Sequence, residues 1–318
     1  DEDNRKKLPK DIKIPPTLAF ENEFVKEALI YCKKFKSVGV CENFYYPSTF
    51  DEASLQLDYF LKEKFENFGT YQDAITKDIK QNFLFHSNIS SSLNIGLLDL
   101  NELIEKIVAF DAPYNAKEGF IRQIIGWREF MLRVYEDDGV PLRNSNFFEF
   151  KNPMPKKIIE TKSGIKILDD TISKLQLTAY NHHIERLMIL GNIFLLLEIK
   201  PNDVYEFFMK YYIDAYDWVM VGNVYGMSGF SDGGSITTKP YIASSNYLLK
   251  MSDYSKNESW CEIVDGLYWR FLYKYSHKFD KNPRMKMQIA LLNKMPKEKL
   301  ENLLKIANDF LENLFIAN

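Results

Sequence analysis

The sequence contains little cysteine, little histidine and no long hydrophobic run. Three Cys among 318 residues are too few for a disulfide framework. No apolar run approaches the roughly 20 residues that span a bilayer, and the mean hydropathy is −0.30, so we expect no membrane segment. The formal net charge of −3 lacks the basic excess of proteins held to nucleic acid by bulk electrostatics. A nucleic-acid role would therefore need a local basic groove.

Signatures of metal and nucleotide sites are missing too. The four His and three Cys do not fall at metal-ligand spacing, and the adjacent His182 and His183 are not part of an HExxH motif. Neither a Walker loop nor a GxGxxG motif occurs in the sequence. The sequence therefore predicts no metal-ion site.

Aromatic residues and helical periodicity are abundant. The chain carries 24 Phe, 19 Tyr and 4 Trp, too many for a disordered polypeptide. Apolar residues recur at helical spacing, and no convincing run alternates as a strand does. Residues 178–197 are apolar on most sides, which is typical of a central buried helix. We therefore predict an all-α fold, with further helical stripes at 24–35, 57–65, 103–108, 120–134 and 300–314.

Residues 1–16 have a different composition. They combine five basic and four acidic residues with three Pro, and they show neither apolar periodicity nor the apolar core of a signal peptide. We predict a linker-like segment over 1–16 and one helical domain over 17–318. An ordinary frayed terminus is the alternative reading.

The segment AYNHHIERLMILGN brings two histidines and an arginine onto the most apolar predicted helix. Arg186 lies within one helical turn of both His182 and His183. Burying two imidazoles and a guanidinium costs free energy unless a polar or anionic group pairs with them, and Asp214 is the candidate partner. The histidine pair suits general acid chemistry near neutral pH, and a purely structural pair is the alternative.

Two other segments could contact a ligand. Residues 85–99 gather four serines before Leu93, as at a helix N-terminus that offers hydroxyl and N–H groups to a phosphate. A helix cap with spare serines is the alternative. Residues 222–234 hold five of the 14 Gly between helical segments, which lets the backbone approach a ligand closely. The interleaved Tyr225 and Phe230 favour an ordered loop over a mobile one.

Together these segments resemble the flavin-binding helical region of the photolyase/cryptochrome superfamily, and most closely its bacterial iron–sulfur branch, which includes prokaryotic (6-4) photolyases. The resemblance rests on ordered blocks that include FGTYQDAI (68–75), EGFIRQIIGWREFM (118–131), AYNHHIERLMILGN (179–192), YIDAYDWV (212–219), GMSGFSDGG (226–234) and KPYIASSNYLLKMSDY (239–254). It implies that residues 17–318 bind FAD and that the partner is UV-damaged DNA. In this family a light-excited reduced flavin passes an electron to a pyrimidine lesion flipped out of the duplex.

The resemblance also implies roles for particular residues. The expected FAD contacts are a diphosphate cradle, a salt bridge and the surrounding wall, formed by His86, Ser87, Ser90, Arg186, Asp214, Tyr216 and Asn223. The residues expected at the lesion are His182, His183 and Tyr241, of which one histidine donates a proton. The expected DNA contacts are Trp127, Arg128 and Lys239.

The sequence departs from this family branch where a four-iron cluster is held by four Cys. Ser255 and Glu258 stand in place of two of these ligands, and Ile167 occupies the upstream position. Cys261 alone remains, and a single thiol cannot hold a cluster. We therefore expect no iron–sulfur cluster.

The electron-supply route and the domain content differ as well. A Trp-Tyr pair of the relatives corresponds to Phe207 and Phe208, which are harder to oxidise, so photoreduction by that route should fail. Met220 stands where relatives carry a polar residue near the flavin. The family's antenna-binding domain is not part of this sequence, so a separate N-terminal α/β domain or protein partner is expected.

The resemblance thus predicts a flavin-dependent, light-driven DNA lyase of the (6-4) type, without cluster or antenna domain. One alternative is a degenerate helical scaffold that serves as an interaction subunit without catalysis. The other is a cryptochrome-like flavin photoreceptor that has lost repair. Three unpaired Cys and the lack of a signal peptide favour the cytoplasm or another reducing intracellular compartment.

Overall fold

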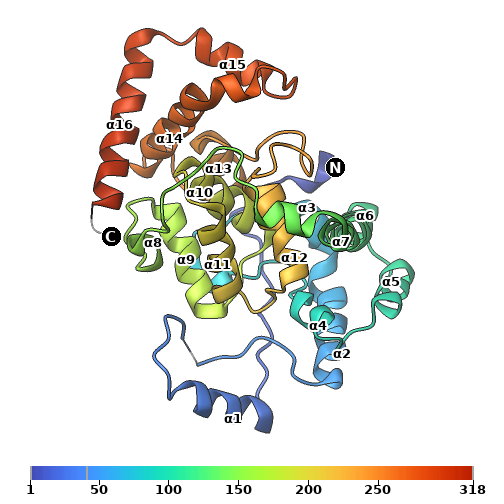
Figure 1. Ribbon diagram of the computed structural model, residues 1–318. Helices are drawn as coiled ribbons and strands as arrows, with labels where there is room; N and C mark the ends of the chain where they lie inside the picture. Colours follow the sequence, from blue (N-terminus) through green and yellow to red (C-terminus); the bar gives the residue numbers. More distant parts are fainter. Residues whose placement is uncertain (1, 41, 317–318) are drawn as a thin grey trace.

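The structure, a computed structural model, describes residues 2–40 and 42–316 (Figure 1). Within these ranges the chain forms sixteen α-helices and no β-strand, and the only β-pairing consists of isolated bridges at Ile75–Ser252 and Asn152–Ile199. The all-α prediction is confirmed. In the same ranges no helix is both long and apolar enough to cross a membrane.

Eight helices belong to the first half of the chain. They are α1 (Glu23–Cys32), α2 (Phe50–Tyr59), α3 (Phe65–Tyr71), α4 (Ser90–Asn94), α5 (Leu100–Ala109), α6 (Tyr114–Ile121), α7 (Phe130–Arg143) and α8 (Lys156–Ile159). Side-chain caps start several of them. Thr49 accepts a hydrogen bond from the N–H of Glu52 at α2, and Asp99 accepts from the first turn of α5.

The second half of the chain contains the helices that surround the molecule's largest core. They are α9 (Lys166–Thr178), α10 (Asn192–Leu196), α11 (Pro201–Tyr211), α12 (Asp217–Val221), α13 (Ser245–Met251), α14 (Trp260–Tyr275), α15 (Lys286–Asn293) and α16 (Lys297–Phe315). Figure 1 shows α14, α15 and α16 together at one end of the molecule and α1 at the other. The closing helix α16 begins directly after Pro296 and contains the helical stripe predicted at 300–314.

Buried apolar side chains form two main clusters. The central cluster surrounds α10 and includes Ile189, Leu190 and Ile193, all fully buried. The lateral cluster joins α2, α3, α5 and α6 and includes Phe65 and Leu103. Each fully buried side chain of this size contributes about 1.5–3 kcal/mol to stability, so both clusters hold their helices firmly.

The predicted helix over 178–197 is interrupted, and that part of the prediction is wrong. Thr178 ends α9, where its hydroxyl donates to the carbonyl oxygen of Lys174, and Ala179 takes a left-handed conformation with φ of 54°. A helix resumes only at His183. Periodicity does not reveal the break because Ala seldom adopts this conformation, which costs an L-residue about 1–2 kcal/mol.

The glycine-rich segment 222–234 is helical over its first half rather than a loop. Residues Gly222–Ser228 form a π-helix that continues α12. A Cβ atom at Gly222 would lie 2.5 Å from Sδ of Met131, and one at Gly226 would lie 2.5 Å from Cγ1 of Ile236. Glycine is therefore needed here for close helix packing, and the prediction that the segment is ordered is confirmed, since Tyr225 is buried.

The segment 2–16 lies against the helical domain. The side chain of Asn4 is 1% exposed, and Nδ2 donates to the carbonyl oxygen of Asn115. The backbone N–H of Lys6 donates to Thr70, and the hydroxyl of Tyr59 donates to the carbonyl oxygen of Pro16. These contacts fix both ends of the segment to α2, α3 and α6.

Candidate functional site

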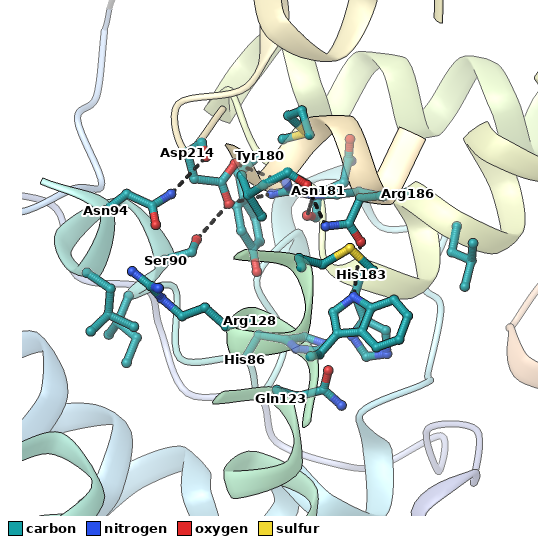
Figure 2. A pocket seen from close by; sticks show the side chains of 18 of the residues that line it. His86, Ser90, Asn94, Gln123, Arg128, Tyr180, Asn181, His183, Arg186 and Asp214 are labelled. Atoms are coloured by element: carbon teal, nitrogen blue, oxygen red, sulfur yellow. Dashed lines mark hydrogen bonds and ion pairs between the residues drawn. The ribbon is translucent and has the colours of Figure 1, made fainter. Parts of the chain in front are cut away.

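A cavity of about 280 Å³ lies between the two apolar clusters. Leu187, Phe208 and Met220 line it from the central cluster, and Phe68 and Phe120 line it from the lateral cluster. Polar side chains converge on one part of its wall, as Figure 2 shows: Ser90, Asn94, Asn181, Arg186 and Asp214. A mostly apolar cavity with a few convergent polar groups is typical of a small-molecule or cofactor site.

Three π-helical stretches supply much of this lining. They are Arg122–Glu129, Glu185–Gly191 and Gly222–Ser228. A π-helical turn holds one residue more than an α-helical turn, and such turns are frequent at functional sites. The lining residues from these stretches are Gln123, Ile124, Trp127, Arg128, Arg186, Leu187, Asn223, Val224 and Ser228.

Arg186 and Asp214 form a bidentate ion pair in the wall. Nη1 and Nη2 of Arg186 each lie 3.0 Å from one carboxylate oxygen, and Nε donates to the carbonyl oxygen of Asn181 at 2.6 Å. The guanidinium also lies over the rings of Tyr180 and Tyr212, at 5.0 and 4.3 Å. Burial opposes the charge, but the carboxylate and the two tyrosines outweigh it and raise the pKa of Arg186. The partner predicted from the cost of burial is therefore in place.

The serine-rich segment meets this ion pair. Ser90 Oγ donates to Oδ2 of Asp214 at 2.6 Å, and Asn94 Nδ2 donates to the backbone carbonyl of Asp214 at 3.0 Å (Figure 2). Ser87 and Ser90 line the cavity, whereas Ser92 is fully buried without a hydrogen-bond partner. Ser87 and Ser90 thus present their hydroxyl groups to the cavity, and the hydroxyl of Ser90 also orients the carboxylate of Asp214.

Three of the four histidines lie together beside the cavity, and two of them, His86 and His183, line it. The rings of His86 and His182 stack with centroids 4.5 Å apart, and His183 meets His86 edge-on at 5.9 Å. Burial, reinforced by neighbouring cationic groups, lowers the pKa of both His86 and His182 well below the ordinary value. Both rings are therefore neutral at pH 7.

Most ring nitrogens of the stacked pair lack hydrogen-bond partners. They are Nε2 of His86 and both nitrogens of His182. Glu185 Oε2 lies 3.6 Å from His182 Nε2, but Glu185 is already held by Lys174, whose ammonium lies 2.6 Å from Oε1. This ion pair is fully buried, so breaking it by removing one partner would cost about 3–5 kcal/mol.

His183 differs from its neighbours in access and in pairing. Its side chain is 41% exposed, it lines the cavity, and Nε2 lies 3.4 Å from Oδ1 of Asp73. Asp73 in turn lies 3.6 Å from Nε of Arg5. Of the two adjacent histidines, His183 alone lines the cavity and carries a carboxylate partner there.

The mouth of the cavity carries indole and guanidinium groups. Trp127 Nε1 donates to Asn223 Oδ1 at 3.0 Å, and the guanidinium of Arg128 lies 4.7 Å from the ring centroid of Trp218. Trp218 also lines the cavity. The indole hydrogen bond fixes the side chain of Asn223 beside the opening.

Several residues expected at the site lie outside this lining. They are His182, Tyr216, Lys239 and Tyr241. His182 is buried behind His86, Tyr216 and Lys239 are exposed, and Tyr241 packs partly buried against the central cluster. Sequence reasoning in turn missed Asn94, Gln123, Tyr180, Asn181 and Trp218, which line the cavity; each lies in a segment that the sequence analysis singled out, but none was assigned a role there.

The positions where the relatives' cluster ligands are expected differ in exposure: Ser255 is exposed, Glu258 is partly buried and Ile167 is buried. Ile167 is fully buried, the backbone N–H of Ser255 donates to Glu258, and Cys261 Sγ lies 3.9 Å from the carbonyl oxygen of Ser255. Trp260 fills the space beside them at 1% exposure. In the described part of the chain, no group of three or more His, Cys, Asp or Glu is placed to hold a metal ion.

Phe207 and Phe208 are buried beside the site. Phe208 lines the cavity and stacks on Tyr212 with centroids 5.1 Å apart, and Phe207 packs on Phe194 in the central cluster. Both rings are 3% exposed. Their arrangement is that of ordinary aromatic packing.

The fold and the cavity define an all-helical domain with a candidate ligand site, and comparison with known proteins identifies relatives. A (6-4) photolyase of Agrobacterium fabrum is 36% identical over 331 residues, covering 99% of this chain and 65% of that protein. The chain therefore spans slightly less than two thirds of the length of this relative. The chain is homologous to this member of the photolyase/cryptochrome superfamily over nearly its whole length.

Three further proteins are similar to parts of the chain or share its fold. Two uncharacterized proteins of Acanthamoeba polyphaga mimivirus are 44% identical over 128 residues and 33% identical over 109 residues, covering 40% and 32% of this chain and 100% and 81% of their own lengths. A bacterial class III photolyase structure from Agrobacterium tumefaciens matches with a TM-score of 0.53 and 18% identity over 85% of this chain and 55% of that chain, which shows a shared fold. No protein-family model matches the chain.

Proposed function

We propose that this protein is a flavin-dependent, light-driven DNA lyase that acts on UV pyrimidine lesions of the (6-4) type and works without an iron–sulfur cluster. The observation that carries the proposal is the cavity between the two apolar clusters, which both the Arg186–Asp214 ion pair and His183 line. The similarity to a (6-4) photolyase over 99% of this chain supports it further.

The residues present fit FAD. Ser87 and Ser90 offer hydroxyl groups suited to a diphosphate, and the Arg186–Asp214 pair offers donors and acceptors to the polar edge of the flavin ring. Nε2 of His86 is buried without a partner, and His86 lines the cavity, so a polar ligand group could complete its hydrogen bonding. Phe208 supplies apolar surface for a ring system.

The roles of the two adjacent histidines depend on their surroundings. His183 lines the cavity, and its Nε2 lies 3.4 Å from Oδ1 of Asp73, so the carboxylate orients the ring; an imidazole placed at the cavity suits a general acid. His182 is neutral, because burial lowers its pKa, and it keeps His86 in place by stacking. When bound, a reduced flavin supplies a light-driven electron to the lesion. Trp127 and Arg128 would meet the flipped lesion and its phosphate at the mouth.

A repair assay tests this function. The protein is loaded with FAD, reduced chemically in the absence of oxygen, and illuminated with near-UV light on an oligonucleotide that carries one (6-4) lesion. We expect lesion reversal in light and none in darkness, loss of reversal in His183→Ala with flavin content unchanged, and full reversal in the exposed-surface control Asn302→Ala. Reversal of cyclobutane dimers alone would refute the (6-4) assignment, and metal analysis that finds four irons per chain would refute the cluster-free one.

Two other functions predict different outcomes. Burial of Phe207 and Phe208 where relatives carry oxidisable residues favours a scaffold or interaction subunit without catalysis. A colourless, flavin-free protein would establish that reading, because oxidised flavin absorbs strongly in the near-UV and blue. Bound flavin with light-induced spectral change and no repair would indicate a cryptochrome-like photoreceptor. A separate α/β domain or protein partner remains part of the proposal.

A further inference from the structure

Large apolar side chains are exposed in succession in one stretch near the start of the chain. Residues 31–40 are all exposed, and together with the end of α1 they carry five such side chains at 42–65% exposure: Ile30, Tyr31, Phe35, Val38 and Val40. Single exposed apolar residues are ordinary on protein surfaces, but a contiguous group marks a place where a partner or a lipid surface binds. We call residues 30–40 the apolar edge.

The apolar edge carries positive charge only. Its charged residues are Lys33, Lys34 and Lys36, a net charge of +3, whereas the whole chain carries −3. Within residues 2–40 and 42–316 none of these three lysines forms an ion pair, and Lys34 Nζ lies 5.6 Å from the ring centroid of Tyr31. The rings of Tyr31 and Phe35 pack together with centroids 5.1 Å apart. Cations and aromatic rings thus share one surface.

The apolar edge is fixed to the helical domain at both ends. Asn22 accepts a hydrogen bond from the N–H of Val25 at 3.0 Å, and its Nδ2 donates to Ser48 Oγ at 2.7 Å, which anchors the start of α1 beside α2. At the other end, the N–H of Val40 donates to the carbonyl oxygen of Gln176 in α9 at 3.0 Å. The exposed side chains therefore project from a segment with a defined position.

The apolar surface continues inward behind α1. A cavity of about 560 Å³ separates α1 from the end of α9, and apolar side chains line it from both sides, among them Leu29, Val38, Leu177 and Ile213. Leu177 and Ile213 are themselves 43% and 39% exposed. Within α1 only Val25 is buried. Both faces of α1 therefore leave apolar area that a partner can cover.

Charge decides which partner fits this surface. Two copies of the chain paired about a two-fold axis would bring the same three lysines against one another, which opposes association. An anionic bilayer has the complementary arrangement, because its headgroups attract Lys while its acyl boundary accepts aromatic and aliphatic side chains. Figure 1 shows α1 and the segment after it at the edge of the molecule, at the end away from α14, α15 and α16, where an extended flat surface can approach them.

We propose that the apolar edge binds the surface of an anionic phospholipid bilayer, with its apolar side chains at the acyl boundary and its three lysines among the headgroups. Long lysine side chains extend past apolar neighbours to reach the headgroups, so both kinds of side chain can be satisfied at once. Neither flavin nor DNA takes part in this binding. The inference therefore goes beyond the proposed function and can fail or succeed independently of it.

Flotation with large lipid vesicles, carried out in the dark, tests the inference. The protein is mixed with phosphatidylcholine vesicles that contain about 30% phosphatidylserine or none, and we expect partition to the neutral vesicles to be at least about tenfold weaker. Each lysine near an anionic surface contributes about fivefold, so K33Q/K34Q/K36Q should lower partition to the anionic vesicles roughly a hundredfold. The apolar variant I30S/Y31S/F35S should lower it at least about tenfold, because three side chains can no longer leave water.

Matched variants separate lipid binding from loss of folding. V108S/Y114S/V140S changes three apolar side chains of 57–81% exposure on α5, α6 and α7, and K77Q/K80Q/K256Q removes three exposed lysines elsewhere; both should bind vesicles like the wild type. K33R/K34R/K36R keeps the charge and should keep the binding.

Three results would overturn the inference. One is equal partition of the wild type and the two apolar-edge variants, and another is equal partition of the wild type to neutral and anionic vesicles. The third is a dimer in sedimentation that I30S/Y31S/F35S dissociates, without binding to either kind of vesicle, which would assign the surface to a second copy of the chain.

Discussion

The polar groups around the cavity fall into two sets that differ in how fully their hydrogen bonds are made. Both carboxylate oxygens of Asp214 and three nitrogens of Arg186 have partners, and Ser90 and Asn94 hold Asp214 from a second side. In the stacked His86 and His182, three ring nitrogens have none. Arg186 and Asp214 are oriented by their own contacts whether or not a ligand is bound. The stacked histidines, in contrast, have ring nitrogens that can still form hydrogen bonds.

This difference indicates that the Arg186–Asp214 set stabilises the fold, whereas the stacked His86 and His182 are present for the chemistry of the site. An unpaired buried donor or acceptor costs about 1–3 kcal/mol, and apolar residues of similar shape would remove that cost. The Arg186–Asp214 pair is costly only when broken. Variants in the two sets should therefore change stability in opposite directions. Two predictions test this, and two further ones provide smaller effects for comparison, from the largest effect to the smallest.

Removing the carboxylate of Asp214 should have the largest effect. Asp214→Ala leaves the buried guanidinium of Arg186 without its partner, and we expect the free energy of unfolding to fall by about 3–5 kcal/mol in urea titrations. Removing Glu206 from its exposed pair with Lys210 serves as the control and should cost at most about 1 kcal/mol. Equal losses in the free energy of unfolding would mean that the buried Arg186–Asp214 pair stabilises the fold no more than the exposed Glu206–Lys210 pair does.

The stacked histidines should make stability depend on pH. Burial lowers the pKa of His86 and His182, so the unfolded chain binds more protons than the folded chain once the pH falls below about 6.5. Above about pH 6.5 the two rings cause no loss of stability through protonation. As the pH falls below that value, the free energy of unfolding decreases by about 1.4 kcal/mol per pH unit for each ring. Urea titrations at pH 7, 6 and 5 should show this slope, and H86F/H182F should flatten it and raise stability at pH 7.

The exposed His277 provides the matched control for that experiment. His277→Asn should leave the slope between pH 7 and pH 5 as it is in the wild type. A flat wild-type profile over the same range would show that the stacked rings are protonated in the folded protein, and the contrast between the two polar sets would then disappear.

A smaller effect is expected at the mouth of the cavity. Trp127→Phe removes the indole donor to Asn223 while keeping an aromatic ring, so the free energy of unfolding should fall by about 0.5–1.5 kcal/mol. Thermal unfolding measures this change. Trp127→Ala would also delete the ring, and a similar loss for both variants would mean that the hydrogen bond accounts for the whole effect.

The smallest effect should come from a solvated ion pair on the outer face of α7. Arg133 Nε lies 2.7 Å from Oδ2 of Asp137, but both side chains are about half or more exposed. Arg133→Ala should change the free energy of unfolding by less than about 0.5 kcal/mol, an effect that salt at about 1 M should abolish. A larger change in the free energy of unfolding would show that a short distance between the two charges is enough for an exposed ion pair to stabilise this protein.

Local rules in the sequence predict the helical class and one essential contact. The Arg186–Asp214 pair can be inferred because a buried guanidinium requires an anion, although 28 residues separate the two. The stacking of His86 on His182 cannot be inferred in this way, because a neutral imidazole demands no particular partner. The break at Ala179 escapes prediction since its left-handed conformation is imposed by tertiary contacts.

The π-helical stretches are also beyond the reach of periodicity. Over a single turn the apolar pattern of a π-helix is too close to that of an α-helix for the two to be told apart, so the widened turns at Glu185–Gly191 and Gly222–Ser228 leave no visible mark in the sequence. Composition identifies the serine-rich segment as a candidate ligand contact, but the direction in which Ser90 points depends on where Asp214 lies.

These π-helical stretches affect where the chain can lose a single residue and still fold. Deleting one residue from Gly222–Ser228 would convert the widened turn into an α-helical one, because a π-helical turn holds one residue more than an α-helical turn. The helical segments on either side would keep their relative orientation, whereas the same deletion inside α14 would rotate one flank against the other by about 100°. Single-residue deletions should therefore unfold the chain less readily in this stretch than in α14, although they would remove the widened turn that carries Asn223 and Val224 at the cavity wall.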